Sequence, residues 1–270
     1  MGLGKEPIIA RIVYRADRQE TSSKTVIFLH GLLVGDGVER SAFLCAPLLR
    51  KLVILGRLRI VMPEFDLLFK RRYDEPKDLR LGPVSRPVID EIKRLTGPYK
   101  QFTVIAYSYG AVILAKLLRT PLAEKIEAIG LIAPAVSWIR DSWIDPLSML
   151  QVSIISGTHD KFARDEDILR RWFPRGQFCS INGANHLYYL MPNPMDCHDE
   201  HPGIISRDEQ LRRTVQNLIA YLGIPLREKT AESFGIVEVT QGGNRDLTEE
   251  FERKMKQMVN KTSGSKDTAW

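Results

Sequence analysis

Apolar and polar positions along the chain form segments whose lengths suit strands and helices in turn. Short apolar runs, typical of buried strands, lie near residues 8–15, 25–30, 58–63, 102–107, 126–133, 151–156 and 177–182. Segments with a helical pattern lie near 40–53, 84–95, 110–119, 164–172 and 207–222. This alternation predicts an α/β fold, in which a mainly parallel sheet carries helices on both faces.

The character of the chain changes after Pro225, where charged residues become more frequent than in the chain as a whole. We therefore expect one folded domain over residues 1–225 and a charged C-terminal extension over 226–270. Within the extension, the span Asp246 to Asn260 is predicted to be an amphipathic helix, because apolar residues recur on one stripe. These residues are Leu247, Phe251, Met255 and Met258. By default such a helix docks on its own domain, although it can also bind a protein partner or a membrane surface.

One strand-to-helix junction carries a serine, Ser108, flanked at two positions on either side by Ala106 and Gly110. Small residues let the chain reverse sharply, so the turn is expected to lift the hydroxyl out of the sheet and leave it exposed. The next residue, Tyr109, begins the helix, and its N–H would point to where an oxyanion forms. The alternative interpretation is that Ser108 only caps the helix, because serine is a favoured N-cap residue.

Two later strand-like runs also end in turns with polar residues. Asp160 follows the first run in the sequence Gly-Thr-His-Asp, and His186 follows the second. If the strands are parallel, both side chains lie at the same sheet edge as Ser108. A hydroxyl nucleophile needs a general base, and that base needs an orienting acid. The three residues therefore form a candidate triad in the chain order Ser, Asp, His.

An upstream strand-like run ends in His30-Gly31, where glycine lets the backbone bend toward a substrate. Together with the Ala-Tyr-Ser-Tyr-Gly turn, the Gly-Thr-His-Asp turn and the turn of His186, this run resembles the α/β-hydrolase superfamily over roughly residues 9–223. Alanine replaces the first glycine of the family's nucleophile motif. The resemblance implies an α/β-hydrolase catalytic domain over 1–225, with a minimal cap because Pro134 to Leu150 is too short for a large one.

The resemblance also implies a serine hydrolase that cleaves a carboxylic ester or thioester through an acyl-enzyme. In this scheme Ser108 attacks the carbonyl, His186 transfers the proton and Asp160 orients His186. The backbone N–H groups of Leu32 and Tyr109 form the oxyanion hole. No cofactor is expected, and the substrate is a small molecule.

Several alternatives remain open at the level of sequence. Asp141 and Asp145 are rival acids, because a triad acid can also come from the preceding strand, although the Gly-Thr-His-Asp turn favours Asp160. The same fold and triad support amidase or peptidase, acyltransferase and cofactor-free haloperoxidase chemistry. A non-catalytic binding protein that has kept the pocket is a rival of another class. Candidates for all three triad members are present, which favours an enzyme.

Composition and charge argue against several other classes of function. The 270 residues are 44% hydrophobic, enough for one large core, and the net charge of +6 comes from basic residues scattered among 33 acids. We therefore expect no nucleic-acid partner. No apolar stretch approaches about 20 residues, so no transmembrane segment is expected.

Three cysteines at no framework spacing and no recognisable signal peptide predict a cytoplasmic location. Residues 197–201 lack a recognised metal-ligand spacing, so no metal is expected.

Overall fold

The computed structural model describes residues 8–15, 24–31, 39–65, 85–97, 99–136, 139, 150–160, 166–186, 205–228, 235–241, 245–246, 249 and 253. The strands are β1 (Ile8–Arg15), β2 (Lys24–Leu29), β3 (Leu58–Phe65), β4 (Phe102–Tyr107), β5 (Ile126–Ile132), β6 (Gln151–Gly157), β7 (Gln177–Ile181), β8 (Gly235–Gln241) and β9 (Arg245–Asp246). The helices are α1 (Glu39–Leu55), α2 (Ser85–Thr96), α3 (Gly110–Leu117), α4 (Glu166–Trp172) and α5 (Arg207–Tyr221), with a short 3₁₀ helix at Pro121–Lys125.

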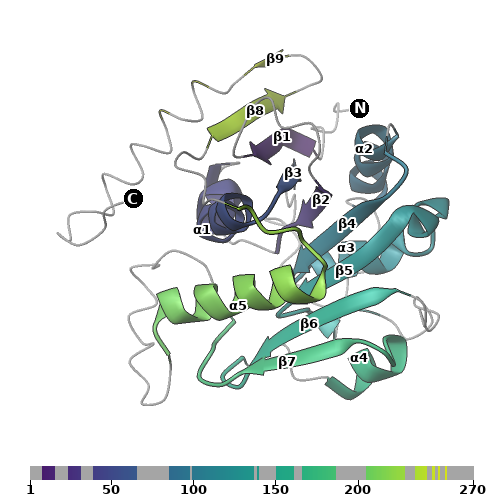
Figure 1. Ribbon diagram of the computed structural model, residues 1–270. Coiled ribbons are helices and arrows are strands. Elements are labelled where there is room, and N and C mark those ends of the chain that lie inside the picture. The colour runs from purple at the N-terminus through teal and green to yellow at the C-terminus, as the bar shows by residue number, and fades with distance from the viewer. Residues whose placement is uncertain are drawn as a thin grey trace, which may run out of the picture.

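The described strands form a single nine-stranded sheet in the order β7-β6-β5-β4-β2-β3-β1-β8-β9, which can be followed from bottom to top in Figure 1. β2 pairs in parallel with β3 and β4, and the pairing stays parallel through β5, β6 and β7. β1 pairs antiparallel with β3. The predicted mainly parallel α/β sheet is therefore confirmed, and its parallel part brings the carboxyl ends of six strands to one edge.

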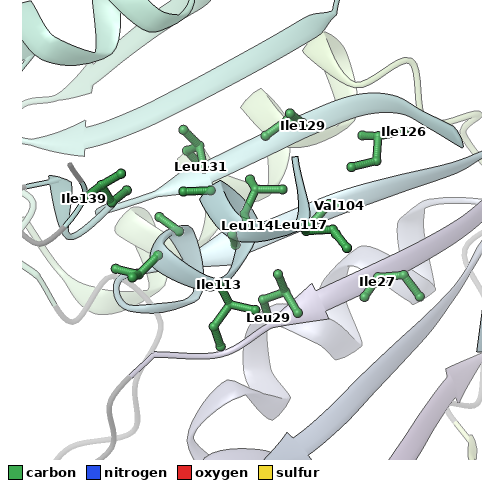
Figure 2. Close-up of a cluster of buried hydrophobic side chains, with 14 of the residues drawn as sticks. Ile27, Leu29, Val104, Ile113, Leu114, Leu117, Ile126, Ile129, Leu131 and Ile139 are labelled. Atoms are coloured by element: carbon green, nitrogen blue, oxygen red, sulfur yellow. The ribbon is translucent and has the colours of Figure 1, made fainter. Parts of the chain in front are cut away.

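Two hydrophobic cores cover the two faces of the sheet. On one face, apolar side chains of α2, α3 and α4 pack against the strands. Figure 2 shows part of this core, where Ile113 and Leu114 of α3 lie near Leu29 of β2 and Leu131 of β5. On the other face, α1 and α5 pack against the strands. Helices cover both faces of the sheet, as the alternating pattern predicts.

The C-terminal extension contains strands that the sequence analysis did not predict. β8 pairs antiparallel with β1, and β9 pairs with β8. The segment of β8 is rich in β-branched residues, but it is short and flanked by charged and glycine-rich sequence, which hides the strand pattern. β8 covers an edge of β1 that would otherwise present unpaired backbone groups. The extension after residue 225 therefore contributes to the sheet of the main domain.

The structure describes the predicted C-terminal helix and the predicted cap only in part. Of the predicted helix from Asp246 to Asn260, Asp246 belongs to β9, whereas Glu249 and Arg253 are helical. Its apolar stripe, Leu247, Phe251, Met255 and Met258, lies outside the described residues. β5 and β6 are joined by residues 133–150, a short connection of which the structure describes only part. The docking of the helix and the minimal cap remain predictions.

Candidate active site

Ser108 occupies the sharp turn between β4 and α3. Its φ of 50° lies in the left-handed region, which is strained for a residue with a side chain. The Ser108 N–H donates to the carbonyl of Ile132 at 2.9 Å, and the Ser108 carbonyl accepts from the N–H of Ala135 at 3.1 Å. These bonds tie the turn to the end of β5. The strained conformation is therefore held by the neighbouring strand.

Gly110 explains why the turn needs a small residue after the serine. A Cβ atom at this position would lie 2.1 Å from the carbonyl oxygen of Leu29 and 2.8 Å from its carbonyl carbon. Both atoms belong to the backbone of the adjacent strand and cannot move aside cheaply. α3 can start this close to β2 only because residue 110 has no side chain.

Ser108 does not serve as the cap of α3. The N-cap residue is Tyr109, with helical φ and ψ of −61° and −24° and no side-chain capping bond. The Ser108 hydroxyl instead lies 3.0 Å from Nε2 of His186. The residue is only 9% exposed, less than the sequence suggested, because buried tyrosines flank it and His186 contacts its hydroxyl.

A continuous chain of hydrogen bonds joins the three side chains singled out in the sequence. Nδ1 of His186 lies 3.0 Å and 3.1 Å from the two carboxylate oxygens of Asp160, so its N–H can donate to both. That leaves Nε2 as an acceptor for the Ser108 O–H. The His186 side chain is 18% exposed, whereas Asp160 is 2% exposed. The carboxylate is thus screened from water, and the histidine reaches from it to the serine.

The turns that carry Asp160 and His186 are bonded directly to each other. The N–H of Thr158 donates to the carbonyl of Ile181, and the N–H of His159 donates to the carbonyl of Ala184 at 2.9 Å. The hydroxyl of Thr158 also accepts from the N–H of Gly183 at 2.9 Å. The sequence analysis did not assign Thr158 a role, and its place in the Gly-Thr-His-Asp turn was the only signal for it. These bonds help to set the distance between Asp160 and His186.

His30 shapes the backbone beside the serine. Its ring is fully buried, and Nδ1 donates to the carbonyl of Gly31 at 2.9 Å. Burial lowers the pKa of His30 to about 4, and the hydrogen bond to Gly31 opposes this only in part. His30 is therefore neutral at pH 7, with its proton on Nδ1, the nitrogen that donates to Gly31.

Of the two predicted oxyanion donors, Tyr109 lies within the described residues and Leu32 does not. Tyr109 is the N-cap of α3, so its N–H lies at the positive end of the helix dipole. Leu32 lies outside the described residues, although the preceding Gly31 lies against Ser108, where a Cβ on residue 31 would be 3.0 Å from Cβ of the serine.

Some further residues singled out in the sequence are not described. The rival acids Asp141 and Asp145 lie outside the described residues, as does the segment 197–201 that was considered for metal binding. Neither Cys45 nor Cys179 forms a disulfide, and Cys197 belongs to the undescribed segment. Within the described part of the chain, no helix combines the length and apolar character that crossing a membrane requires.

The parallel sheet, the helices on both faces and the strained serine turn together define the α/β-hydrolase fold, and solved structures bear this out. The chain is similar to a putative alpha/beta hydrolase of unknown function from Agrobacterium tumefaciens, with 21% identity, a TM-score of 0.51, and coverage of 80% of this chain and 93% of the other. It is similar to the carboxylesterase CesB from Bacillus subtilis, with 12% identity, a TM-score of 0.52, and coverage of 80% and 88%.

A third similar structure is Est1E from Butyrivibrio proteoclasticus, with 10% identity, a TM-score of 0.50, and coverage of 80% of this chain and 96% of the other. At these identities the likeness shows the fold. No protein-family model matches the chain, and no curated protein matches it. Because one fold supports many reactions, the reaction has to be argued from the site.

Proposed function

We propose that the protein is a serine hydrolase that cleaves a carboxylic ester or thioester through an acyl-enzyme. The observation that carries the proposal is the hydrogen-bonded chain from Ser108 through His186 to Asp160, with distances of 3.0 Å to the serine and 3.0 Å to the acid. A nucleophile within reach of a base, and a base held by a buried carboxylate, is the arrangement that activates a serine hydroxyl.

In the proposed reaction, Oγ of Ser108 attacks the acyl carbon while Nε2 of His186 takes the hydroxyl proton. The negative charge on the carbonyl oxygen is held by the N–H groups of Tyr109 and Leu32. His186 then gives its proton to the leaving oxygen or sulfur, and the acyl-enzyme remains on Ser108. Water, deprotonated by His186, attacks the acyl carbon and releases the acid, and the proton returns to the serine.

Asp160 has two parts in this scheme. Its carboxylate accepts from Nδ1 of His186, which keeps Nε2 unprotonated and pointed at the serine. It also stabilises the positive charge that His186 acquires when it takes the proton, and its burial strengthens that interaction. Apart from the substrate and the attacking water, every group in this mechanism is a side chain or backbone group of this chain.

The ester or thioester class is the finer part of the proposal. The likeness to the carboxylesterase CesB and the predicted minimal cap support an acyl group that reaches the serine without a large lid. Cys45 and Cys179, neither of which is in a disulfide, support a reducing compartment, and we include a cytoplasmic location in the proposal.

Covalent labelling with a fluorophosphonate, followed by peptide mapping, tests the proposal. We expect one label per chain, on Ser108, and none on the folded Ser108→Ala variant. Ser206→Ala is the matched control, because Ser206 is a helix-capping serine whose hydroxyl accepts from the N–H of Glu209. It should be labelled like the wild type. A folded wild-type protein that takes no label would instead favour a binding protein.

A further inference from the structure

Tyr107 lies where the three parts of the candidate site meet. It is the last residue of β4 and precedes Ser108 directly. Its side chain is 2% exposed and belongs to the core on the α1 and α5 face. A buried tyrosine needs a partner for its hydroxyl, so what that hydroxyl binds indicates what the residue does.

The hydroxyl of Tyr107 donates to the backbone carbonyl of His186 at 2.9 Å, across 79 positions of sequence. Its ring also lies against the imidazole, with centroids 5.5 Å apart and planes tilted by 38°. On another side the ring contacts Gly31, where a Cβ would come within 2.8 Å of the ring carbons Cδ1 and Cε1. One side chain therefore touches the backbone of His186, its ring and the chain that leads to Leu32.

We propose that Tyr107 is a positioning residue, which holds His186 in register with Ser108 through the hydrogen bond from its hydroxyl to the His186 carbonyl. This inference rests on the proposed hydrolase function. The bond fixes the backbone of His186, in addition to the side-chain contacts of His186 with Ser108 and Asp160 and the bonds between the two turns. Proton transfer depends steeply on the distance between Nε2 and Oγ, so a small shift of the backbone reduces the rate.

Tyr107→Phe removes the hydroxyl and keeps the ring, and it tests the inference directly. Because the bond acts on the base and not on substrate binding, kcat on an activated ester should fall about tenfold, with KM within about twofold of wild type. The rate of fluorophosphonate labelling should fall by a similar factor. Tyr14→Phe is the matched control, because Tyr14 is also buried but lies on β1, separated from β4 by β2 and β3.

A second pair of variants separates the hydrogen bond from the packing of the ring. p-Aminophenylalanine at position 107 restores a donor, whereas p-methylphenylalanine has a group of similar size and no donor. The amine should recover most of the labelling rate and the methyl should not. This pair also decides the matter if Tyr107→Phe melts below the assay temperature, since both members fill the space of the hydroxyl.

Combination with His186→Ala shows whether Tyr107 acts through the histidine. In the His186→Ala background, Tyr107→Phe should have no further effect on the residual labelling rate. An equal loss in both backgrounds, or wild-type labelling by Tyr107→Phe, would overturn the inference and leave the proposed function intact. An unlabelled wild-type protein would overturn both.

Discussion

Asp160 is the buried end of the hydrogen-bonded chain that reaches Ser108, and its role can be tested by a single change. Asp160→Asn should lower kcat by about 10³-fold or more, because an amide that donates to Nδ1 selects the wrong tautomer of His186. Circular dichroism and thermal melting should show an intact fold, and hydrolysis of an activated ester measures the loss.

The rival acids supply the control for that prediction. Asp141→Asn and Asp145→Asn should each leave kcat within about threefold of wild type, since neither change removes the carboxylate that binds Nδ1 of His186. The reverse ranking, with a large loss at Asp141 or Asp145 and a small one at Asp160, would move the acid to the connection after β5.

The buried, neutral His30 predicts that the protein becomes less stable as pH falls. Its pKa is about 4 in the folded protein, below the usual 6.5, because burial opposes the charged form. As pH falls from 6.5 toward 4, the unfolded chain binds a proton at this position and the folded protein does not. The free energy of unfolding should therefore fall across this window, with a slope of at most about 1.4 kcal/mol per pH unit from this group.

His30→Asn keeps a side-chain N–H donor near Gly31 and has nothing to titrate. Urea unfolding at pH 4, 5, 6 and 7 should show that the stability difference between wild type and His30→Asn shifts in favour of the variant as pH falls. Parallel curves for the two proteins over this range would show that His30 does not contribute to acid instability.

At the scale of elements, the close approach of α3 to β2 depends on Gly110. Gly110→Ala would place a Cβ 2.1 Å from the Leu29 carbonyl oxygen, so the start of the helix must move. We expect a loss of about 2 kcal/mol or more in the free energy of unfolding, together with a much slower labelling of Ser108. Denaturant unfolding and labelling rates measure the two effects.

Gly97→Ala is the matched control substitution, at the glycine that directly follows the last residue of α2. A Cβ at position 97 would meet backbone oxygens of Lys93 and Arg94 at 3.5 Å and 3.6 Å, which is ordinary contact. Its stability should stay within about 1 kcal/mol of wild type. If Gly110→Ala proved as harmless as Gly97→Ala, the tight contact between α3 and β2 would not be needed for the site.

For the whole molecule, removing the strands of the extension should lower stability more than removing only the residues that follow them. A chain that ends at Asp246 keeps β8 and β9, whereas one that ends at Glu228 lacks β8 and leaves that edge of β1 unpaired. The shorter chain should therefore melt roughly 5 °C or more below the longer one. Both should label at Ser108 within about threefold of the full chain, since the proposed site ends at His186. If the chain ending at Asp246 folds normally but takes no label, residues 247–270 must act at the active site.

Local sequence was sufficient to predict most of this fold and the three side chains of the proposed site. Each of the seven strands and five helices predicted before residue 225 matches an element of the structure, because apolar runs of strand length and helical stripes reflect burial directly. Ser108, Asp160 and His186 could be found because each stands in a short turn after a strand. In a parallel sheet such turns meet at one edge.

Tertiary structure alone decided how those parts are joined. The pairing of β8 with β1, the bonds of Thr158 to the turn of His186 and the hydrogen bond from Tyr107 to His186 link residues that are far apart in the chain. The partners in such contacts are ordinary residues with no local pattern. They come together only when strands and helices pack, so the sequence determined which groups are present, and packing determined which of them touch.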